Sequence, residues 1–402
     1  MNSWTLILLP SLVAKRVSDT QIIITQKFLD GVLEYLKYWP GKLLVLLEED
    51  SNLTNNLDNV TIDINQLPFQ IRVVNFDFIQ DELESQNNSI VLAAVSNRQN
   101  YISAVCDSKN IPCFYVSEYT LRTRIQIVNA TNGNFLRRLR KYVWEIHQEW
   151  KQRKAIAQAS GIQCNGTPTF MAYQTVSPHA LLYFDTRVTE DMLINDLELR
   201  ERTSYCLGSQ PLRLVFSGRL LKIKGADHLI LVAKELKKLG VRFEMSIFGD
   251  GDLKNAMISQ IQALGLTDSV KMMGTLEFKN ELVPFIKKNA DLFICCHRQG
   301  DPSCTYLETM SCGVPILGYD NEAFIGLVKA SHTGWLVKLN RPDLLAKKVA
   351  ELDSNRQAIV TESYKAIDFS RQHTFEKTFQ RRIDHIKTVS RLNLLGTKTS
   401  EQ

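Results

Sequence analysis

The chain has 402 residues, of which 44% are hydrophobic and 23% charged. That length favours two domains, because single domains usually hold roughly 100–200 residues, and the near-average composition excludes a disordered, collagen-like or disulfide-stapled chain. The net charge of +5 is unevenly spread, since the segment 122–154 contains nine Lys or Arg residues against two Glu residues. That one segment carries +7, and the rest of the chain carries −2.

The cysteines and the apolar runs bear on the expected redox compartment and on contact with a membrane. Eight cysteines occur without a Cys-x-x-Cys pair or a His at zinc-ligand spacing, so we expect no metal site, and Cys295 and Cys296 read as buried, reduced thiols. The apolar start of the chain has no basic residue before it, which predicts a strand and not a signal peptide. No apolar run approaches the ~18 residues of a membrane span, so we expect membrane contact to be peripheral.

In the amino half, short apolar runs alternate with amphipathic stretches. The expected strands are 4–9, 43–47, 70–75, 90–95 and 112–116. The expected helices are 19–38 and 97–109, and the Asn- and Asp-rich segment 51–67 is an expected loop. Continuous apolar strands separated by helices predict a parallel sheet that is covered on both faces.

The carboxyl half repeats this alternation, so the sequence predicts the α/β class with two doubly wound parallel sheets. The expected strands are 213–217, 243–248, 270–273, 292–296, 314–317 and 334–337. A stretch with little periodicity at 203–211 separates the halves, which gives domains at 1–205 and 206–368 and a final helix at 369–402. We expect that helix to return to the first domain and to end in a frayed tail. Two such domains would face a central cleft between the carboxyl ends of their strands, where ligands of these sheets bind.

Two glycine turns follow strands of the second domain. After the first strand, Gly218 precedes Arg219 and Lys224, and a planar guanidinium with an ammonium group suits a diphosphate. The segment Gly249-Asp250-Gly251 follows the next strand, where glycines permit close approach of a ring or ribose. The structural alternative for the first motif is a pair of surface cations in a loop. For the second motif it is a tight turn.

A third motif lies between Gly300 and Pro315. Asp301 followed by Pro302 predicts a helix N-cap, which would direct backbone N–H groups into the cleft. Glu308 follows in a short apolar helix, where a carboxylate needs a partner, and a ribose diol is one. The structural alternative for Glu308 is an exposed glutamate paired with a lysine.

These motifs, in this order, resemble the retaining nucleotide-sugar glycosyltransferases of the two-Rossmann (GT-B) type, the large family 4 or group 1 class. The resemblance rests on Ser217-Gly-Arg219 with Lys224-Gly225, Gly249-Asp-Gly251, Met273-Gly274 and Leu307-Glu308-Thr-Met-Ser-Cys-Gly313-Val-Pro315. It covers the second domain well and the first only by architecture. It implies an acceptor-side first domain and a nucleotide-sugar donor second domain.

The resemblance also implies roles for individual residues. Arg219 and Lys224 look like the catalytic clamp on the diphosphate, and Glu308 is similar to the glutamate that holds the ribose hydroxyls. Gly249, Gly251 and Gly274 resemble the turns around the nucleobase. The expected donor-binding residues are Gly218, Gly249, Asp250, Gly251, Gly274, Asp301, Ser303, Cys304, Thr305 and Glu308.

The chain departs from the family pattern at two places. A glutamate usually stands eight residues before Glu308 and touches the sugar, but Gly300 occupies that position here. Asp301 could substitute for it through a one-residue shift, or the role could be lost. The glycine-rich first loop of the family is replaced by Leu9-Pro10-Ser11.

In the first domain, Glu118 follows the expected strand at 112–116 and would face the cleft. The resemblance makes it a candidate catalytic residue near the acceptor, and the alternative is a structural carboxylate. His179 and His297 are weaker candidates.

The charged segment contains a helix, expected over about 134–159, on which aromatic residues lie among the cations. Its apolar stripe is Leu136, Leu139, Val143, Ile146 and Trp150. Its basic patch, a candidate surface for a membrane or an anionic acceptor, consists of Arg137, Arg138, Arg140 and Lys141 together with Trp144. Cations in the first turns oppose the helix dipole, so an anionic lipid surface would suit them. The alternative is that the stripe packs into the first domain and the charges are solvated.

The leading hypothesis is a cytoplasmic, peripheral membrane glycosyltransferase that moves a sugar from a nucleotide-diphosphate-sugar donor to a lipid or lipid-linked glycan hydroxyl with retention. Arg219 and Lys224 would take the place of a metal ion, because preorganised cations stabilise the charge that grows on the leaving diphosphate. No other cofactor and no nucleic acid are expected. The alternatives are a nucleotide-sugar epimerase on the same fold and a catalytically degenerate sugar-nucleotide-binding subunit, which Gly300 favours.

Overall fold

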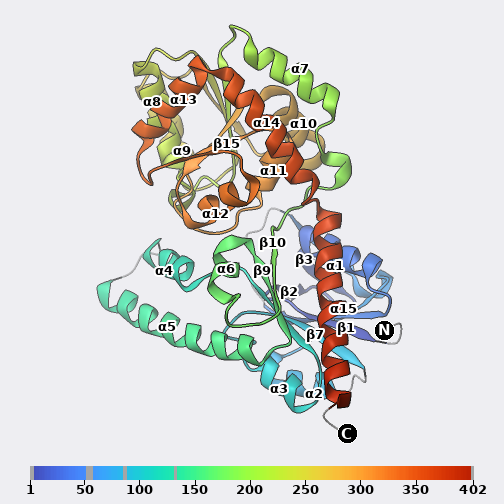
Figure 1. The fold of residues 1–402 in the computed structure, drawn as a ribbon. Coiled ribbons are helices and arrows are strands. Elements are labelled where there is room, and N and C mark those ends of the chain that lie inside the picture. The colour runs from blue at the N-terminus through green and yellow to red at the C-terminus, as the bar shows by residue number, and fades with distance from the viewer. Residues whose placement is uncertain (1–3, 51–57, 85–87, 131–133, 400–402) are drawn as a thin grey trace. The chain divides into compact units, whose positions relative to one another are not determined.

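The computed structural model describes residues 4–50, 58–84, 88–130 and 134–399, which form two compact units (Figure 1). Unit 1 comprises Met1–Val128, Gly133–Tyr183 and Glu376–Gln402, and unit 2 comprises Asn129–Asn132 and Phe184–Phe375. Each unit is built around its own sheet, in which most strand pairs are parallel. The predicted α/β class, with a parallel sheet in each of two domains, is confirmed.

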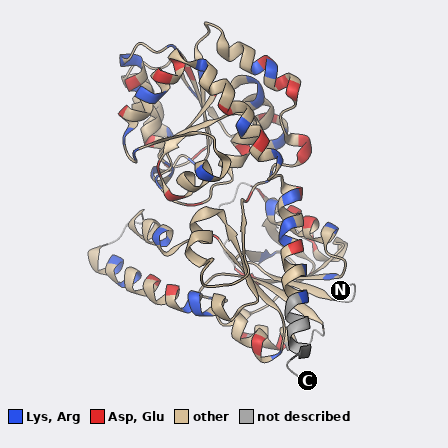
Figure 2. Ribbon diagram, viewed as in Figure 1, with Lys and Arg blue, Asp and Glu red and all other residues tan. Residues whose placement is uncertain are grey.

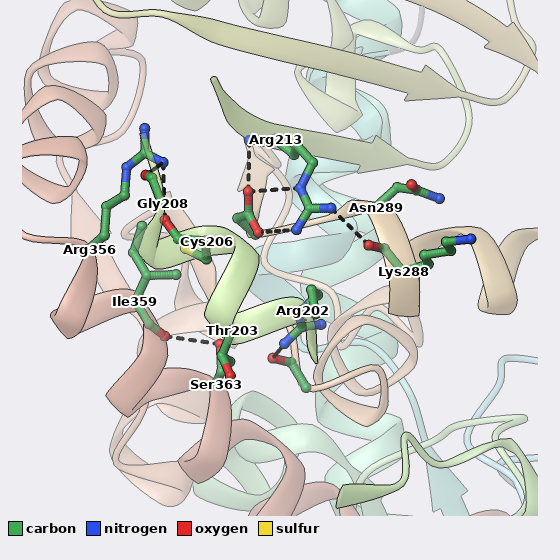
Figure 3. A network of polar contacts seen from close by, with 12 residues as sticks. Arg202, Thr203, Cys206, Gly208, Arg213, Lys288, Asn289, Arg356, Ile359 and Ser363 are labelled. Carbon is green, nitrogen blue, oxygen red and sulfur yellow. Dashed lines mark hydrogen bonds and ion pairs between the residues drawn. The ribbon is translucent and has the colours of Figure 1, made fainter. Parts of the chain in front are cut away.

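The chain divides after Tyr183, well before the expected boundary at residue 205. The reason is that helix α7 (Asp196–Leu207) is anchored in unit 2. Its Arg202 is almost fully buried and donates hydrogen bonds to the carbonyls of Cys312 and Gly313 (Figure 3). Burial lowers the pKa of Arg202 to about 10.

A second arginine holds the end of α7. The guanidinium of Arg356 donates to the carbonyls of Cys206 and Gly208 at 3.0 and 2.9 Å (Figure 3). At the start of the first strand of unit 2, Arg213 makes a bidentate ion pair with Asp291, with Nη2 to Oδ1 at 2.6 Å and Nε to Oδ2 at 3.0 Å. The segment 203–211, which was expected to separate the two domains, is therefore tied to unit 2.

The sheet of unit 1 has the strand order β10-β9-β8-β7-β1-β4-β2-β3-β5, with β6 beside β4. The pairs from β10 to β4 are parallel, whereas β3 is antiparallel to both β2 and β5. The strands are β1 (Thr5–Leu9), β2 (Val13–Arg16), β3 (Gln21–Thr25), β4 (Lys42–Glu49), β5 (Asn59–Asp63), β6 (Gln70–Val73), β7 (Ser89–Ala94), β8 (Cys113–Ser117), β9 (Gly161–Asn165) and β10 (Ala180–Tyr183).

Two expectations for this sheet were wrong. The helix expected over 19–38 begins only at Gln26, because the β-branched run at 22–25 forms strand β3 and Thr25 caps the helix. The loop expected over 51–67 contains strand β5, which pairs with β3; residues 51–57 lie outside the described part.

Helices of unit 1 pack on both faces of the sheet. On one face, Ile7, Val91 and Tyr115 join a core with residues of α2, α3, α5 and α6. Elsewhere α1 packs against α15, with the Tyr35 and Phe379 ring centroids 4.8 Å apart. The helices are α1 (Gln26–Tyr38), α2 (Ile79–Glu84), α3 (Ile102–Ser108), α4 (Leu121–Ala130), α5 (Phe135–Gln158), α6 (Gly166–Tyr173) and α15 (Phe375–Thr399).

Helix α15 belongs to unit 1 from Glu376 onward, where the expected final segment began at residue 369. Its Arg382 lies in unit 1, where Nε donates to Gln163 Oε1 on β9 at 2.8 Å. The helix continues to Thr399, so it includes the first residues of the tail expected to be frayed, and residues 400–402 lie outside the described part.

The sheet of unit 2 is parallel throughout, in the order β13-β12-β11-β14-β15-β16. Its strands are β11 (Leu212–Ser217), β12 (Phe243–Phe248), β13 (Val270–Gly274), β14 (Leu292–Cys295), β15 (Ile316–Tyr319) and β16 (Trp335–Val337). The helices besides α7 are α8 (Ala226–Lys238), α9 (Lys254–Ala263), α10 (Val283–Asn289), α11 (Thr305–Ser311), α12 (Glu322–Ser331), α13 (Pro342–Ser354) and α14 (Arg356–Arg371). Successive strands are added on one side of β11 up to β13 and then on its other side from β14 onward. The carboxyl ends of β11 and β14 therefore flank a topological switch point.

All eight cysteines are free thiols, and all but Cys304 are buried. Cys295 and Cys296 lie at the end of β14 with no exposed surface, and burial raises the pKa of Cys295 to about 12. The expectation of buried thiols at this pair is confirmed.

Candidate functional site

Three turns of unit 2 are joined at the carboxyl ends of β11, β12 and β13. Gly218 N–H donates to the carbonyl of Phe248 at 3.1 Å, and Leu220 N–H donates to the carbonyl of Asp250 at 2.8 Å. Gly249 N–H in turn donates to the carbonyl of Gly274 at 2.7 Å. The structure thus brings together the glycines of the first two motifs at the carboxyl edge of the sheet, on the β11 side of the switch point.

Gly249 is required by both conformation and space. Its φ is +126°, a region that residues with a side chain rarely adopt, and a Cβ at this position would lie 1.9 Å from the carbonyl oxygen of Gly218. The two turns can approach this closely only because Gly249 has no side chain.

Asp250 is exposed between the two glycines of the second turn. One of its carboxylate oxygens accepts from Gly251 N–H at 2.7 Å, and the other accepts from Lys254 Nζ at 2.9 Å. The hydrogen bond from Lys254, together with the one from the backbone, lowers the pKa of Asp250. These local contacts fix the shape of the turn.

Lys224 and Asp301, which the sequence assigned to separate motifs, form an ion pair. Lys224 Nζ lies 2.8 Å from Asp301 Oδ2, and the side chains are 10% and 15% exposed. Asp301 Oδ1 is buried and has no hydrogen-bond partner among the described residues. Arg219 is exposed on its turn, and its carbonyl accepts from Leu221 N–H at 2.9 Å.

The helix expected to begin at Pro302 starts later. Helix α11 begins at Thr305, and residues 301–303 form a turn in which Ser303 N–H donates to the Asp301 carbonyl at 2.9 Å. Asp301 is not an N-cap, because its carboxylate is taken up by Lys224 instead. Cys304 Sγ donates to Asp185 Oδ2 at 3.2 Å.

Glu308 is buried on α11 and already has a partner in the protein. Its Oε1 lies 2.7 Å from Nε of Arg187, and the Arg187 guanidinium stacks 3.8 Å from the Phe278 ring centroid. The expectation that Glu308 needs a partner is correct, but that partner is an arginine that the sequence analysis missed. Arg187 stands in no motif, and nothing in its neighbourhood in the sequence points to Glu308.

His297 is buried beside this site, at 1% exposure. Neither ring nitrogen has a hydrogen-bond partner among the described residues. Burial, and then the charge of Lys224, hold the pKa of His297 well below its usual value, so the ring is neutral. Its position directly after β14 agrees with the sequence, and its carbonyl accepts from Asn321 Nδ2 at 3.1 Å.

The remaining candidates lie in unit 1. Glu118 is exposed and directly follows β8, as the sequence predicted. His179 precedes β10 and accepts, through its carbonyl, a contact from the His385 ring at 3.2 Å. Both residues belong to unit 1, so a role for Glu118 or His179 at the site in unit 2 stays a prediction.

Helix α5 in unit 1 has the expected extent, and its apolar stripe faces outward, as docking on a lipid surface requires. All five residues of the apolar stripe are exposed, from 47% at Leu139 to 68% at Leu136. The buried residues of the helix are instead Gln148, Glu149, Gln152, Ala155 and Ile156. The alternative that the stripe packs into the first domain is wrong for the described structure.

Arg124 on α4 explains this orientation. Its guanidinium lies 2.8 Å from Glu145 and 2.8 Å from Glu149, and both carboxylates are nearly buried. These are the two acidic residues of the segment 122–154, whereas Arg137, Arg140 and Lys141 of the basic patch are exposed. Figure 2 shows basic residues along much of α5. Among the described residues, no helix is long and apolar enough to cross a membrane.

Comparison with protein families gives one match in the second half of the chain. Residues 200–368 match the family model described as Glycosyl transferases group 1. A putative colanic acid biosynthesis glycosyltransferase, WcaL, is 27% identical over 175 residues in Salmonella typhimurium and 30% identical over 160 residues in Escherichia coli K12. These segments are 40% and 37% of this chain, and 42% and 39% of the relatives. The amylovoran biosynthesis glycosyltransferase AmsK of Erwinia amylovora is 27% identical over 157 residues, 38% of each chain.

The chain thus spans about two fifths of the length of the curated relatives that it matches. Solved structures match over nearly its whole length. Anabaena Alr3699/HepE in complex with UDP has a TM-score of 0.65 at 12% identity, covering 96% of this chain and 99% of that one. WaaG, a glycosyltransferase involved in lipopolysaccharide biosynthesis, has a TM-score of 0.60 at 12% identity, covering 95% and 99%. The chain has the GT-B fold, and its residues 200–368 match the Glycosyl transferases group 1 model.

Proposed function

We propose that the protein is a retaining glycosyltransferase of family 4 that transfers a sugar from a nucleotide-diphosphate-sugar to a hydroxyl of a lipid or lipid-linked glycan. The observation that carries this proposal is the site at the carboxyl edge of the unit 2 sheet. Three turns are joined there by backbone hydrogen bonds, and Arg219 and Lys224 follow the glycine of the first turn. Relatives named for colanic acid and amylovoran biosynthesis support a role in polysaccharide or glycolipid assembly.

In the proposed reaction, the bond between the anomeric carbon and the diphosphate oxygen breaks, and the diphosphate keeps the electron pair and gains negative charge. The acceptor hydroxyl oxygen bonds to the anomeric carbon, and its proton passes to an oxygen of the leaving diphosphate. Lys224 and Arg219 stabilise that charge in place of a metal ion, and no cofactor besides the donor is needed. Glu308 accepts from the ribose hydroxyls, and Glu118 contacts the acceptor. The complex of the HepE structure with UDP-glucose supports a nucleotide-sugar as the donor class.

We further propose that α5 docks on an anionic membrane at the cytoplasmic face. Its stripe exposes large apolar side chains, including Trp150 at 63%, next to the cations of the basic patch. An apolar face buried in the lipid interface, flanked by Lys and Arg that meet anionic headgroups, is typical of such helices. A lipid-linked acceptor would be reached on that surface.

A donor screen by thermal denaturation tests the donor part of the proposal. A ligand at 100 times its Kd stabilises the folded state by about 2.7 kcal/mol, which is easily measured. We expect at least one nucleoside-diphosphate-sugar, from a panel of UDP-, GDP-, TDP- and ADP-sugars, to raise the melting temperature. Stabilisation without turnover on any lipid acceptor would instead favour a degenerate binding subunit, and conversion of the donor without an acceptor would favour an epimerase.

A further inference from the structure

The loop that follows β14 and the first turn of α12 are held together in unit 2. Asn321, the N-cap of α12, donates from Nδ2 to the carbonyl of His297 at 3.1 Å and to the hydroxyl of Tyr306 at 3.3 Å. Its Oδ1 accepts from Phe324 N–H at 2.9 Å. The residue after this cap, Glu322, is therefore fixed next to the loop that contains Gly300 and Asp301.

Glu322 lies against the position where residue 300 would carry a side chain. A Cβ built on Gly300 would lie 3.1 Å from Glu322 Cβ and 3.5 Å from Glu322 Oε2. Carbon atoms that are not bonded pack best at about 3.5–4.0 Å, so a side chain at residue 300 would press on Glu322. The space at residue 300 is limited by the Glu322 side chain, with Cβ as the nearest atom and the carboxylate next to it.

The Glu322 carboxylate also lacks a partner on one side. Its Oε2 is buried and accepts no hydrogen bond among the described residues. Asp301 Oδ1, on the adjoining loop, is in the same condition, while Asp301 Oδ2 accepts from Lys224. A buried oxygen without a hydrogen bond is costly, so a ligand that donates O–H groups to these oxygens gains affinity.

The two carboxylates and the Lys224 ammonium group suit different parts of a ligand. A carboxylate only accepts hydrogen bonds and repels phosphate, whereas a sugar hydroxyl is a donor. Lys224 supplies the positive charge that a diphosphate needs, at 2.8 Å from Asp301. A phosphate beside Lys224 and a polyhydroxyl group beside the two carboxylates are the two halves of a sugar diphosphate.

We propose that Glu322 is the residue that recognises the transferred sugar, with Oε2 accepting a hydrogen bond from one of its hydroxyls. The inference rests on the proposed function, because it assigns a contact within the same donor site. It places sugar specificity on the first residue of α12, and it makes Gly300 the position that leaves room for this carboxylate.

A purely structural role for Glu322 predicts something different. A carboxylate in the first turn of a helix stabilises the helix through its dipole. Loss of that effect would lower the melting temperature but would leave the preference between a nucleotide and its sugar derivative unchanged. Asp343, in the first turn of α13, provides a matched control for the loss of one such charge in the same unit.

The test measures the Kd of the full chain for a nucleoside diphosphate and for the matching nucleotide-sugar by calorimetry, starting with UDP and UDP-glucose and then GDP and GDP-mannose. For Glu322→Gln we expect the Kd of the nucleotide-sugar to rise about tenfold and that of the nucleoside diphosphate to stay within about twofold, as expected when a charged hydrogen bond is lost. Asp343→Asn should change neither. Gly300→Ala, which adds a methyl group against Glu322, should repeat the pattern of Glu322→Gln independently.

Donors that lack one sugar hydroxyl at a time identify the contact. Wild type should lose about tenfold in affinity for one of these deoxy donors, and Glu322→Gln should lose nothing further with that donor. Equal weakening of nucleoside diphosphate and nucleotide-sugar, or no weakening of either, would overturn the inference and leave the proposed function intact. A wild-type chain that binds none of these nucleotides and sugars would overturn the proposed function and the inference together.

Discussion

Lys224 and Asp301 form a nearly buried ion pair, with Nζ 2.8 Å from Oδ2, although 77 residues separate them in the chain. Lys224 ends the turn after β11, and Asp301 belongs to the loop after β14. The pair therefore joins the two strands that flank the switch point of the sheet. It keeps the ammonium group of Lys224 in place before any anion arrives, which is the preorganisation that charge stabilisation requires.

Replacing Lys224 by alanine should reduce kcat by about 10²-fold or more, because the leaving diphosphate loses a preorganised positive charge. Steady-state rates with the identified donor measure the effect, and circular dichroism shows whether the variant is folded. Lys238→Ala is a matched control, since Lys238 is an exposed lysine at the end of α8 in the same unit. A folded Lys224→Ala enzyme with an unchanged rate would remove Lys224 from the mechanism.

Glu308→Gln should weaken nucleoside diphosphate binding about tenfold, because the ribose hydroxyls lose a charged acceptor. Arg187→Ala should weaken nucleoside diphosphate binding less than Glu308→Gln does. Arg187 is 42% exposed, and an ion pair that faces solvent contributes at most about 1 kcal/mol. Calorimetry with UDP or GDP compares the two variants. If Arg187→Ala weakens binding as much as Glu308→Gln, Arg187 itself contacts the nucleotide.

The orientation of α5 predicts binding to anionic vesicles. Flotation with vesicles of phosphatidylglycerol should recover the protein at low salt and lose it as salt rises, because the Debye length falls to about 10 Å at 0.1 M. Reversal of Arg137, Arg138, Arg140 and Lys141 to Glu should abolish flotation. Reversal of four exposed lysines of unit 2, Lys238, Lys271, Lys288 and Lys347, is the control and should alter it less.

The apolar stripe should matter separately from the charge. Replacing Trp150 and Ile146 by serine should weaken binding even at low salt, because both side chains are more than half exposed and would enter the lipid interface. Flotation that is the same for wild type, the charge-reversed variant and the Trp150 and Ile146 variant would contradict membrane docking by α5.

Unit 1 should lose stability as the pH falls from about 6.5 towards 4. Burial lowers the pKa of His385 from 6.5 to about 4, so the unfolded state binds the proton more strongly across this window. The free energy of unfolding should therefore fall by about 2 kcal/mol between pH 7 and pH 5 on account of this residue. His385→Gln should show a smaller loss in urea denaturation at the two pH values. An equal loss in both proteins would show that other groups carry the pH dependence.

Periodicity and turn chemistry were enough to predict most of the parallel strands of the two sheets and the extent of α5, but not strands β3 and β5. The side of α5 that faces the unit could not be predicted in this way, because it depends on Arg124 of another helix. Arg124 draws Glu145 and Glu149 inward, and the apolar stripe is left outside. Periodicity likewise predicted a helix at 22–25, but these residues form strand β3 because they pair with β5.

Within the site, residues that follow one another in a motif could be predicted, and contacts between distant segments could not. Gly218 and Gly249 were found because glycines after strands mark turns, and Gly274 was found through the family resemblance. Arg187 and Glu322 were missed, since each meets the site only through the fold: Arg187 reaches Glu308 from the segment after β10, and Glu322 reaches Gly300 from the start of α12.

The most direct measurement of the central claim is a transfer assay with the full chain, anionic vesicles containing polyprenyl-linked glycan acceptors, and each nucleotide-sugar that stabilises the protein. Nucleoside diphosphate release and the glycosylated lipid are quantified together. The account predicts that one donor gives equal amounts of both products, with retained anomeric configuration, and that Lys224→Ala lowers both by about 10²-fold. Binding of a nucleotide-sugar without release of nucleoside diphosphate, whatever the acceptor, would contradict it.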